Sequence, residues 1–298
     1  LSADPEAADQ DASLLLMKNG QILLSSFAWF PLPARLAPLL REKGVRISGS
    51  PDGSGCHYIM WGGFTRISTD QGRSWSKHNY LPHLPTANDI IPDKRHSSGG
   101  PVRGQAIECK GEILLPIYKY LDTFKTDTCH LYVSKDNGQS WIYRSAIAAD
   151  HRQKIYFQEP SLISCDNGNI MAFLRTANAG DQLYTVISAD QGKSWKNPVL
   201  REQVIGHPTH PLKLKDGRIF ISYGYRHKPF GIRARLMDKN GQQFIGDELI
   251  IRDDASCGDI GYPWAVQLEN GDILVVYYFT AEDGIRHIAG TTVAIENI

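Results

Sequence analysis

The sequence predicts an all-β fold in which one kind of antiparallel sheet is repeated along the chain. Two recurring patterns in its 298 residues predict it. One is an octapeptide with a fixed Asp, Gly and Trp, which occurs three times. The other is a pair of short apolar runs joined by a tight glycine turn, which occurs five times. Both patterns are typical of antiparallel strands connected by hairpins.

The octapeptide has the form S-x-D-x-G-x-S-W, and each copy follows a short apolar run with strand character. The copies occupy residues 68–75, 134–141 and 188–195. At such a corner the Asp carboxylate can accept backbone N–H groups ahead of it, the Gly tolerates a positive φ, and the Trp can fold back beneath the turn. A fourth, degenerate copy at residues 237–244 keeps the Gly and an aromatic residue but loses the Ser and the Asp.

The second pattern is a strand, a tight turn that contains Gly, and another strand. We predict these hairpins at residues 12–27, 102–118, 160–175, 211–225 and 263–279. Four of the five are followed by an octapeptide or by its degenerate copy, so the repeating unit is a four-stranded antiparallel blade. Repetition of this kind is typical of a β-propeller, in which the blades close into a ring and few strand edges stay exposed.

The phase of the repeat bears on the number of blades. Residues 1–10 read as the tail of a blade whose earlier strands are absent, and residues 290–298 read as a third strand with no octapeptide after it. We therefore expect a single propeller domain over residues 1–298 with a first blade that is incomplete or missing, rather than a five-bladed ring. The widest gap, Trp29 to Cys56, is rich in Pro and Gly and is expected to be a loop with a short helix at Ala34–Lys43. Such an insertion commonly rims the pocket of a propeller, and the alternative is a solvated flap.

Composition excludes several classes of function. The 32 basic and 32 acidic residues balance, so neither a general nucleic-acid role nor a membrane-surface role is expected. No apolar run approaches the length of a membrane span. The five cysteines are odd in number and show no C-x-x-C spacing, which argues against a zinc site and favours buried free thiols. No N-x-S/T sequon is visible, which together with the cysteine pattern favours a bacterial or reducing setting, so we expect a soluble, bacterial protein of the cytoplasm or periplasm. No start Met and no signal peptide is visible, so we expect that targeting information has been removed.

Polar residues recur where the hairpin strands start and end. The inner strands of a propeller line its channel, so the start of a first strand and the end of a second strand point to one mouth. The residues at those positions are Asp11, Arg103, Glu159, Arg175, His207, His210, Arg226, Asp259 and Tyr262. Taken alone, each of them is more simply explained as a member of a structural ion pair or as a solvent-exposed residue at a strand end. Their recurrence at equivalent positions predicts a shared site.

The octapeptide resembles the Asp box, or BNR repeat, of the sialidase superfamily, whose catalytic domain is a six-bladed β-propeller. The resemblance extends over nearly the whole chain. The segment from Glu159 to Arg175 is similar to the one that carries a catalytic Glu and an Arg of the substrate-binding arginine triad. The segment from Asp259 to Tyr278 is similar to the one that carries a nucleophilic Tyr, and residues 207–233 resemble a motif of bacterial sialidase-like proteins.

The resemblance implies an exo-acting glycoside hydrolase that cleaves a terminal acidic sugar without a metal or other cofactor. Tyr262 is then the nucleophile and Glu159 its base, while Arg175 with Arg226 or Arg233 grips the sugar carboxylate in a planar fork that Lys cannot supply. A neutral Tyr avoids the repulsion that a carboxylate nucleophile would meet at a carboxylate-bearing carbon. His210, Arg103 and Asp259 are further candidates for substrate binding.

Two elements of the family pattern are not found in this sequence. The family's first triad arginine and its general-acid Asp lie in the first blade, which we expect to be missing, and Asp11 is the candidate substitute acid. Two alternatives therefore stay open: a propeller that binds acidic glycans without cleaving them, and an enzyme on uronic-acid polysaccharides that uses His207 and His210. In each case the partner is a carbohydrate. The sequence does not define the oligomeric state.

Overall fold

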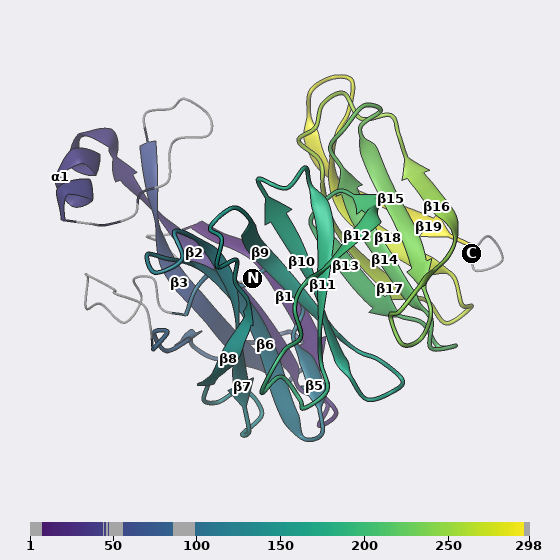
Figure 1. Ribbon diagram of the computed structural model, residues 1–298, viewed down its shortest axis with the longest axis horizontal. Coiled ribbons are helices and arrows are strands. Elements are labelled where there is room, and N and C mark those ends of the chain that lie inside the picture. Colours follow the sequence, from purple (N-terminus) through teal and green to yellow (C-terminus); the bar gives the residue numbers. More distant parts are fainter. Residues whose placement is uncertain (1–7, 44, 46, 48–55, 86–98, 295–298) are drawn as a thin grey trace. The chain divides into compact units, whose positions relative to one another are not determined.

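The protein is almost entirely β in the computed structural model, which describes residues 8–43, 45, 47, 56–85 and 99–294 (Figure 1). The described residues form 19 strands in five antiparallel sheets, and strands that follow one another in the chain are neighbours in each sheet. The chain divides into two compact units, residues 1–145 and 146–298, with the boundary inside the eighth strand. We call them the first and the second unit.

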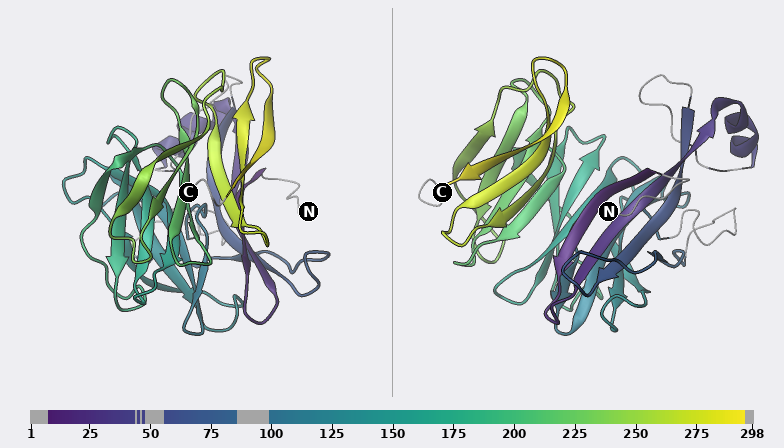
Figure 2. Two further views of the ribbon diagram at one scale, coloured as in Figure 1. Left: turned by 90° about the vertical axis from the view of Figure 1, so that its right-hand side faces the viewer. Right: turned by 180° about the vertical axis from the view of Figure 1, so that it is seen from behind.

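In the first sheet of the first unit, the strands lie side by side in chain order (Figure 2, right). It consists of β1 (Ala8–Leu16), β2 (Ile22–Pro33), β3 (Cys56–Ser68) and β4 (Asn79–Tyr80). Between β2 and β3 the chain forms a 3-10 turn, η1 (Ala34–Leu36), and a short helix, α1 (Ala37–Glu42). The predicted helix is thereby confirmed, and Pro38 stands in its first turn, where a missing N–H costs nothing.

The prediction that residues 1–10 are the tail of an earlier blade is wrong for Ala8 to Gln10. These residues belong to β1, and Ala8 pairs with Trp29 at the far end of β2. The long β2 continues past the predicted hairpin and therefore supplies partners for a longer β1. Residues 1–7 lie outside the described residues, as do 44, 46 and 48–55 of the predicted insertion. The prediction of a further blade stays a prediction.

The second sheet of the first unit begins later than the sequence predicts. It consists of β5 (Ile107–Cys109), β6 (Glu112–Leu121), β7 (Thr126–Ser134) and β8 (Ile142–Ala148). Its first strand starts at Ile107 rather than at Val102, because Pro101 has no N–H for a ladder and the glycines before it break the extended backbone. The segment still contacts β6 through one hydrogen bond, from Tyr118 N to Pro101 O at 3.2 Å.

The second unit contains three sheets. Their strands are β9 (Tyr156–Ser164), β10 (Ile170–Ala177), β11 (Gln182–Ser188), β12 (Val199–Ile205), then β13 (Thr209–Lys213), β14 (Ile219–Tyr225), β15 (Gly231–Met237), β16 (Phe244–Arg252), then β17 (Gly261–Gln267), β18 (Ile273–Thr280) and β19 (Arg286–Val293). The first strand of the middle sheet, β13, contacts both β9 and β17. The first strands of the three sheets therefore lie next to one another, with β13 in the middle. The predicted third strand at the C-terminal side is confirmed up to Val293, and residues 295–298 lie outside the described residues.

The three sheets of the second unit enclose two apolar layers. Phe173 and Ile221 belong to the layer between the first and second sheets, and Phe220 and Val275 belong to the layer between the second and third. Phe220 and Ile221 are consecutive and point to opposite faces, as the two-residue period of a strand requires. Full burial of such side chains contributes about 1.5–3 kcal/mol each, so both faces of the middle sheet hold the unit together.

The octapeptides form three hairpin corners with the same hydrogen bonds. In one copy the Ser194 N–H and hydroxyl donate to Asp190 at 2.9 and 2.6 Å, and the Gly192 N–H donates to the Ser188 hydroxyl at 2.7 Å. The bonds from Ser194 lower the pKa of Asp190 to about 2. The other two copies repeat this network.

The Trp of the octapeptide does not take one position in all copies. The Trp75 indole N–H donates to Gly72 O at 3.1 Å, as the sequence predicts. The Trp141 indole N–H donates instead to Thr65 in the neighbouring sheet of the first unit, at 3.0 Å. The degenerate copy recovers its corner with Asp238, which precedes the usual Asp position by one residue and accepts the Asn240 N–H at 2.7 Å.

Four of the five cysteines, Cys109, Cys129, Cys165 and Cys257, are free thiols. Cys129 and Cys165 are buried, as predicted, and the other two are partly exposed. Burial raises the pKa of Cys165 to about 11, so this thiol stays protonated and inert. None of the helices in the described residues has the length and hydropathy needed to cross a lipid bilayer.

Candidate functional site

Three of the five sheets begin with the same backbone irregularity. Asp11, Glu159 and Tyr262 each stand nine residues before a turn glycine, and the strand register shifts at each of them. All three have a positive φ, at +53°, +44° and +50°. A non-glycine residue in this region costs roughly 1–3 kcal/mol, and such strain concentrates at functional sites.

Two of these bulge residues meet in the second unit, where Tyr262 of β17 contacts Glu159 of β9. The Tyr262 hydroxyl donates to Glu159 Oε1 at 2.8 Å. Arg175 of β10 donates from Nη1 to the same carboxylate oxygen at 2.6 Å and lies 3.1 Å from the Tyr262 hydroxyl oxygen. The three side chains form a closed triangle of a phenol, a carboxylate and a guanidinium, although 103 residues separate Glu159 from Tyr262.

The local sequence explains how Glu159 reaches this position. Arg175 pairs with Gln158 in the ladder, and the register then shifts before Ser161 pairs with Phe173. The shift places Glu159 and Pro160 in the bulge, where the absent N–H of the proline is not needed. The Glu159 side chain is only 4% exposed, and its Oε2 has no hydrogen-bond partner among the described residues. A buried carboxylate oxygen without a partner can accept a proton or a hydrogen bond from a ligand.

A second arginine completes the basic side of this centre. The Arg226 guanidinium lies 5.7 Å from the centre of the Tyr262 ring, and it donates to Ile260 O at 3.0 Å and to the Tyr278 hydroxyl at 2.9 Å. Tyr278 in turn donates to Asp259 at 2.8 Å, and Asp259 also binds Arg286 at 2.6 Å. Asp259, predicted as a substrate ligand, thus orients Tyr278 and through it Arg226.

The sequence leaves open whether Arg226 or Arg233 belongs to the site, and in the structure Arg226 lies against the Tyr262 ring whereas Arg233 pairs within its own sheet. Arg233 on β15 is 8% exposed, pairs with Glu248 at 2.9 Å, and lies over the Tyr225 ring at 4.0 Å. Glu248 also accepts the Tyr223 hydroxyl. Arg233 is therefore committed to a carboxylate of its own sheet.

His207 extends the centre on the side of the middle sheet. Its Nε2 lies 3.2 Å from Asp181 Oδ1, and the second oxygen of Asp181 lies 3.1 Å from His227 Nε2. Burial lowers the pKa of His207 to about 4, and the charges of Arg175 and Arg226 add to this effect against the opposing charges of Asp181 and Glu159. His207 is therefore a neutral imidazole near pH 7, within electrostatic reach of both arginines.

Glycine contacts allow the three strand starts to come together. A Cβ on Gly224 would lie 2.9 Å from Gly261 Cα and 2.9 Å from His207 O. A Cβ on Gly206 would lie 2.6 Å from Gly224 O. Because these contacts are with rigid backbone, only glycine permits the close approach of His207 and Tyr262 to the end of β14.

The other three predicted residues are His210 in the second unit and Arg103 and Asp11 in the first unit. His210 is 2% exposed and packs its ring 4.4 Å from that of Trp264, so it has almost no surface to offer a substrate. Arg103 is 1% exposed, inside the first unit. Asp11 lies in β1 of the first unit, at the bulge described above. We therefore omit His210 from the proposed site.

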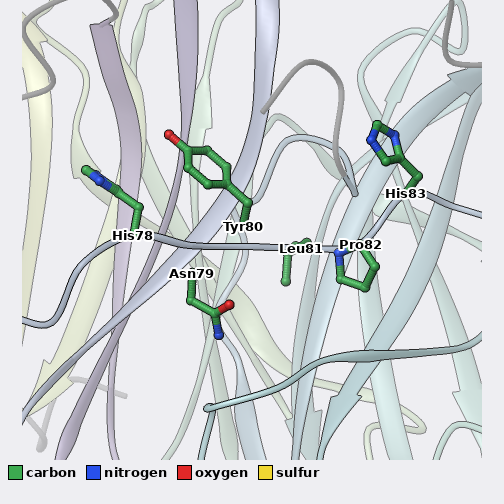
Figure 3. A pocket seen from close by; sticks show the side chains of 6 residues that line it. All are labelled: His78, Asn79, Tyr80, Leu81, Pro82 and His83. Carbon is green, nitrogen blue, oxygen red and sulfur yellow. The ribbon is translucent and has the colours of Figure 1, made fainter. Parts of the chain in front are cut away.

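A groove of about 350 Å³ lies along the short edge strand of the first unit (Figure 3). Its lining consists of residues 78–83, and His78 and Tyr80 project to one side while Asn79 projects to the other. The Asn79 amide binds Gly138 O and Gln139 O of an octapeptide corner, and the rings of His78 and Tyr80 pack on the buried Phe64. These contacts give the groove a structural role. The described residues contain no group of three or more His, Cys, Asp or Glu that could hold a metal.

Sequence reasoning missed Asp181 and Arg286, and it named His227 and Tyr278 only as parts of segments. A signal for Tyr278 exists, since it follows its turn glycine by seven residues, as Arg175 does. Asp181 and His227 lie in loops whose lengths differ between sheets, so the repeat offers no position at which to expect them.

Comparison with known proteins identifies the family. Residues 45–275 match the BNR repeat-like domain, and the chain belongs to this family. None of the curated proteins matches the chain significantly. A solved structure of a protein of unknown function from Dyadobacter fermentans DSM 18053 is 34% identical and superimposes with a TM-score of 0.84, over 98% of this chain and 78% of that one.

More distant structures define the fold. The NanB sialidase from Streptococcus pneumoniae, solved as a mutant, is 14% identical with a TM-score of 0.65, over 98% of this chain. The match spans only 56% of that sialidase. An α-L-arabinofuranosidase from Fusarium graminearum is 14% identical with a TM-score of 0.57, over 99% of this chain and 95% of that one. The chain therefore has the β-propeller fold of the sialidases, as the sequence predicts, with five blade sheets in the described residues.

Proposed function

We propose that this protein is an exo-acting glycoside hydrolase of the sialidase type, which cleaves a terminal acidic sugar from a glycoconjugate. The single observation that carries the proposal is the triangle of Tyr262, Glu159 and Arg175, with all three contacts at 3.1 Å or less. Membership of the BNR repeat-like family and the glycosidases among the structures of the same fold are consistent with it.

In the proposed reaction Glu159 takes the proton of the Tyr262 hydroxyl through the hydrogen bond that already joins them. The phenolate oxygen attacks the anomeric carbon, the glycosidic bond breaks, and the leaving oxygen takes up a proton from a general acid. Water then attacks the anomeric carbon, losing a proton to the deprotonated general acid, and as the bond to Tyr262 breaks the proton on Glu159 returns to the tyrosine oxygen. Arg175 stabilises the charge on that oxygen and, with Arg226, binds the sugar carboxylate.

The test is turnover of aryl glycosides of N-acetylneuraminic acid and of uronic acids, which release a fluorophore. Wild-type protein should cleave at least one of them. Tyr262→Phe should lose roughly 10³-fold or more in kcat, because it removes the nucleophile. Tyr184→Phe, a partly buried tyrosine of the same unit, is the matched control and should stay active. Full activity in Tyr262→Phe would contradict the proposal, and binding without turnover in the wild type would favour a non-catalytic glycan-binding propeller.

Asp11 is our candidate for the general acid, because it occupies in its own sheet the register position of Glu159 and Tyr262. The proposal predicts that Asp11→Asn slows hydrolysis of an alkyl glycoside far more than that of an activated aryl glycoside, whose leaving group needs no proton. Equal losses on both substrates would remove Asp11 from this role. Arg103 stays a candidate carboxylate ligand and Asp259 a positioning residue.

The position of His207 supports a second candidate function, cleavage of a uronic-acid polysaccharide. A neutral imidazole close to two arginines suits removal of the proton next to a carboxylate whose charge the arginines neutralise. His207 rather than His210 would then be the base. Formation of an unsaturated product, detected by the ultraviolet absorbance of its conjugated double bond, would support this alternative if the His207→Ala variant no longer formed that product. Its absence with saturated products would support hydrolysis.

A further inference from the structure

A second polar cluster adjoins the centre in the second unit, and the proposed reaction does not use it. Asp181 lies in the loop between β10 and β11, which directly follows the strand that carries Arg175. Its side chain is 33% exposed. Asn178, Gly180 and Asp181 all have a positive φ, near +60°. The Gly206 N–H donates to Asp181 O at 2.8 Å, which fixes this loop to the segment that carries His207.

The polar atoms of the cluster determine what it offers to a ligand. Asp181 lies 3.2 Å from His207 Nε2 and 3.1 Å from His227 Nε2, and its carboxylate only accepts hydrogen bonds. With a proton on the Nε2 that faces Asp181, the Nδ1 of a neutral His207 is an acceptor. The two carboxylate oxygens retain further lone pairs. The cluster therefore presents acceptors, while the neighbouring pair of Arg175 and Arg226 presents donors.

His207 interacts with both the acceptor groups of the cluster and the donor groups of the two arginines. It is 6% exposed, and its Nδ1 has no hydrogen-bond partner among the described residues. Its Nε2 lies 3.2 Å from Asp181, and the charges of Arg175, Arg226 and Glu159 in the proposed catalytic centre also act on it. His227 is the outer member, with its side chain 45% exposed.

We propose that Asp181, His207 and His227 form a hydroxyl-recognising wall of the site, with Asp181 as the residue that determines specificity. The wall accepts hydrogen bonds from hydroxyl groups of the same acidic sugar whose carboxylate faces the two arginines, so this inference rests on the proposed function. A ligand with a carboxylate on one side and free hydroxyls on the other matches the donor and acceptor surfaces. A sulfate or phosphate ester on the hydroxyl side is repelled by the Asp181 carboxylate.

The test is equilibrium binding by titration calorimetry, which does not depend on turnover. The probes are N-acetylneuraminic acid and D-glucuronic acid, each with a set of analogues that lack one hydroxyl. For wild-type protein, at least one deoxy analogue should bind roughly tenfold more weakly than its parent, as expected for a hydrogen bond to a charged group. In Asp181→Asn the parent should lose a similar factor, and the same analogue should lose nothing further.

Two further variants separate recognition from structure. Asp166→Asn changes an Asp at the opposite end of the same sheet, paired with Lys213, and should leave all affinities unchanged. His227→Gln should reproduce the analogue-specific loss in part. An equal loss for the parent and for every analogue in Asp181→Asn, or no loss at all, would overturn the wall while the proposed function stands. A wild-type protein that binds none of the acidic sugars would contradict both.

Discussion

The octapeptide end and the bulge end of the repeated sheet differ in what the repeat has kept, and the sheets β1–β4 and β9–β12 carry both. At the octapeptide end, the bonds from the last Ser to the Asp carboxylate measure 2.8 and 2.6 Å, 2.9 and 2.5 Å, and 2.9 and 2.6 Å in the three copies. At the bulge end, the backbone is also repeated, with φ between +44° and +53°. The side chains there, however, are Asp11, Glu159 and Tyr262.

This difference separates the fold from the chemistry. An octapeptide corner repeats both backbone and side chains because each copy solves the same local problem, the closing of a hairpin. A bulge repeats only its backbone conformation, which turns one side chain away from the regular strand pairing. The three side chains at this position differ, since two are carboxylates and one is a phenol. The predictions below test whether the bulge end carries function and the octapeptide end carries stability.

The largest effect is expected for Glu159→Gln. The amide keeps the size of the side chain but cannot take the Tyr262 proton, so kcat should fall by roughly 10²–10⁴-fold. The check is steady-state turnover of the aryl glycoside that the wild type cleaves, with binding measured in parallel. Retention of more than a tenth of the wild-type kcat would show that the bulge residue of β9 is not the base.

A smaller effect is expected for Arg175→Lys. Lys keeps the charge but not the planar fork, so binding of the sugar carboxylate should weaken by roughly 10- to 100-fold. The control is the methyl ester of the same sugar, which has no carboxylate for the arginine to grip and should bind both proteins alike. An equal loss for acid and ester would place Arg175 in a purely structural role.

Gly224→Ala tests the close approach of the strand starts. Its Cβ would meet the backbone of Gly261 and His207 at 2.9 Å, so we expect a loss of about 1–3 kcal/mol in the free energy of unfolding together with a loss of activity. Gly290→Ala is the matched strand control, since its nearest neighbour would be a Leu274 methyl group at 3.5 Å. Comparable unfolding midpoints for the two variants would contradict the packing described here.

The smallest effect is expected at the octapeptide end, for Asp190→Asn. The change weakens one exposed corner, so Tm should fall by less than in Gly224→Ala while kcat and KM stay unchanged. Thermal unfolding and turnover on the same preparation check this. A loss of activity without a loss of stability would place chemistry at the octapeptide end.

The same corners predict an acid-sensitive contribution to stability. The pKa values of Asp70 and Asp190 are lowered from 3.8 to about 2, chiefly by hydrogen bonds from Ser74 and Ser194. A carboxyl group with a lowered pKa in the folded state stabilises the protein above about pH 4 and loses that contribution as the pH falls toward 2. Unfolding followed from pH 5 to pH 2 should show Asp190→Asn losing less stability than the wild type over this range.

Much of this architecture could be predicted from the repeat. The hairpins centred on Asn19-Gly20, Asn167-Gly168, Asp216-Gly217 and Asn270-Gly271 are present, because a tight turn flanked by apolar runs fixes both strands locally. The start of β5 could not be predicted, because it depends on whether the strand beside Pro101 finds ladder partners. The assignment of Ala8 to β1 depends likewise on how far β2 extends.

The site could be predicted in part. The sequence predicts Glu159, Arg175, Tyr262 and Arg226 because they lie at strand ends of the repeat. Glu159 and Tyr262 stand at the same distance from their turn glycines because both lie in the same kind of bulge. Asp181 and His227 could not be singled out, because they lie in loops that the repeat does not align and come together only in the folded structure. Burial also decides between candidates that look alike in sequence, since His207 faces charged groups whereas His210 packs on Trp264.

The most direct test of the central claim is to trap the bond to Tyr262. An acidic glycosyl fluoride with a second fluorine beside the anomeric carbon should react with the nucleophile and then hydrolyse slowly, because the electron-withdrawing fluorine disfavours both steps while the fluoride leaves readily. Mass spectrometry of the digested protein should then find one sugar on the peptide that carries Tyr262, and none in Tyr262→Phe. A sugar on any other residue, or turnover of this reagent with no adduct at Tyr262, would contradict the account.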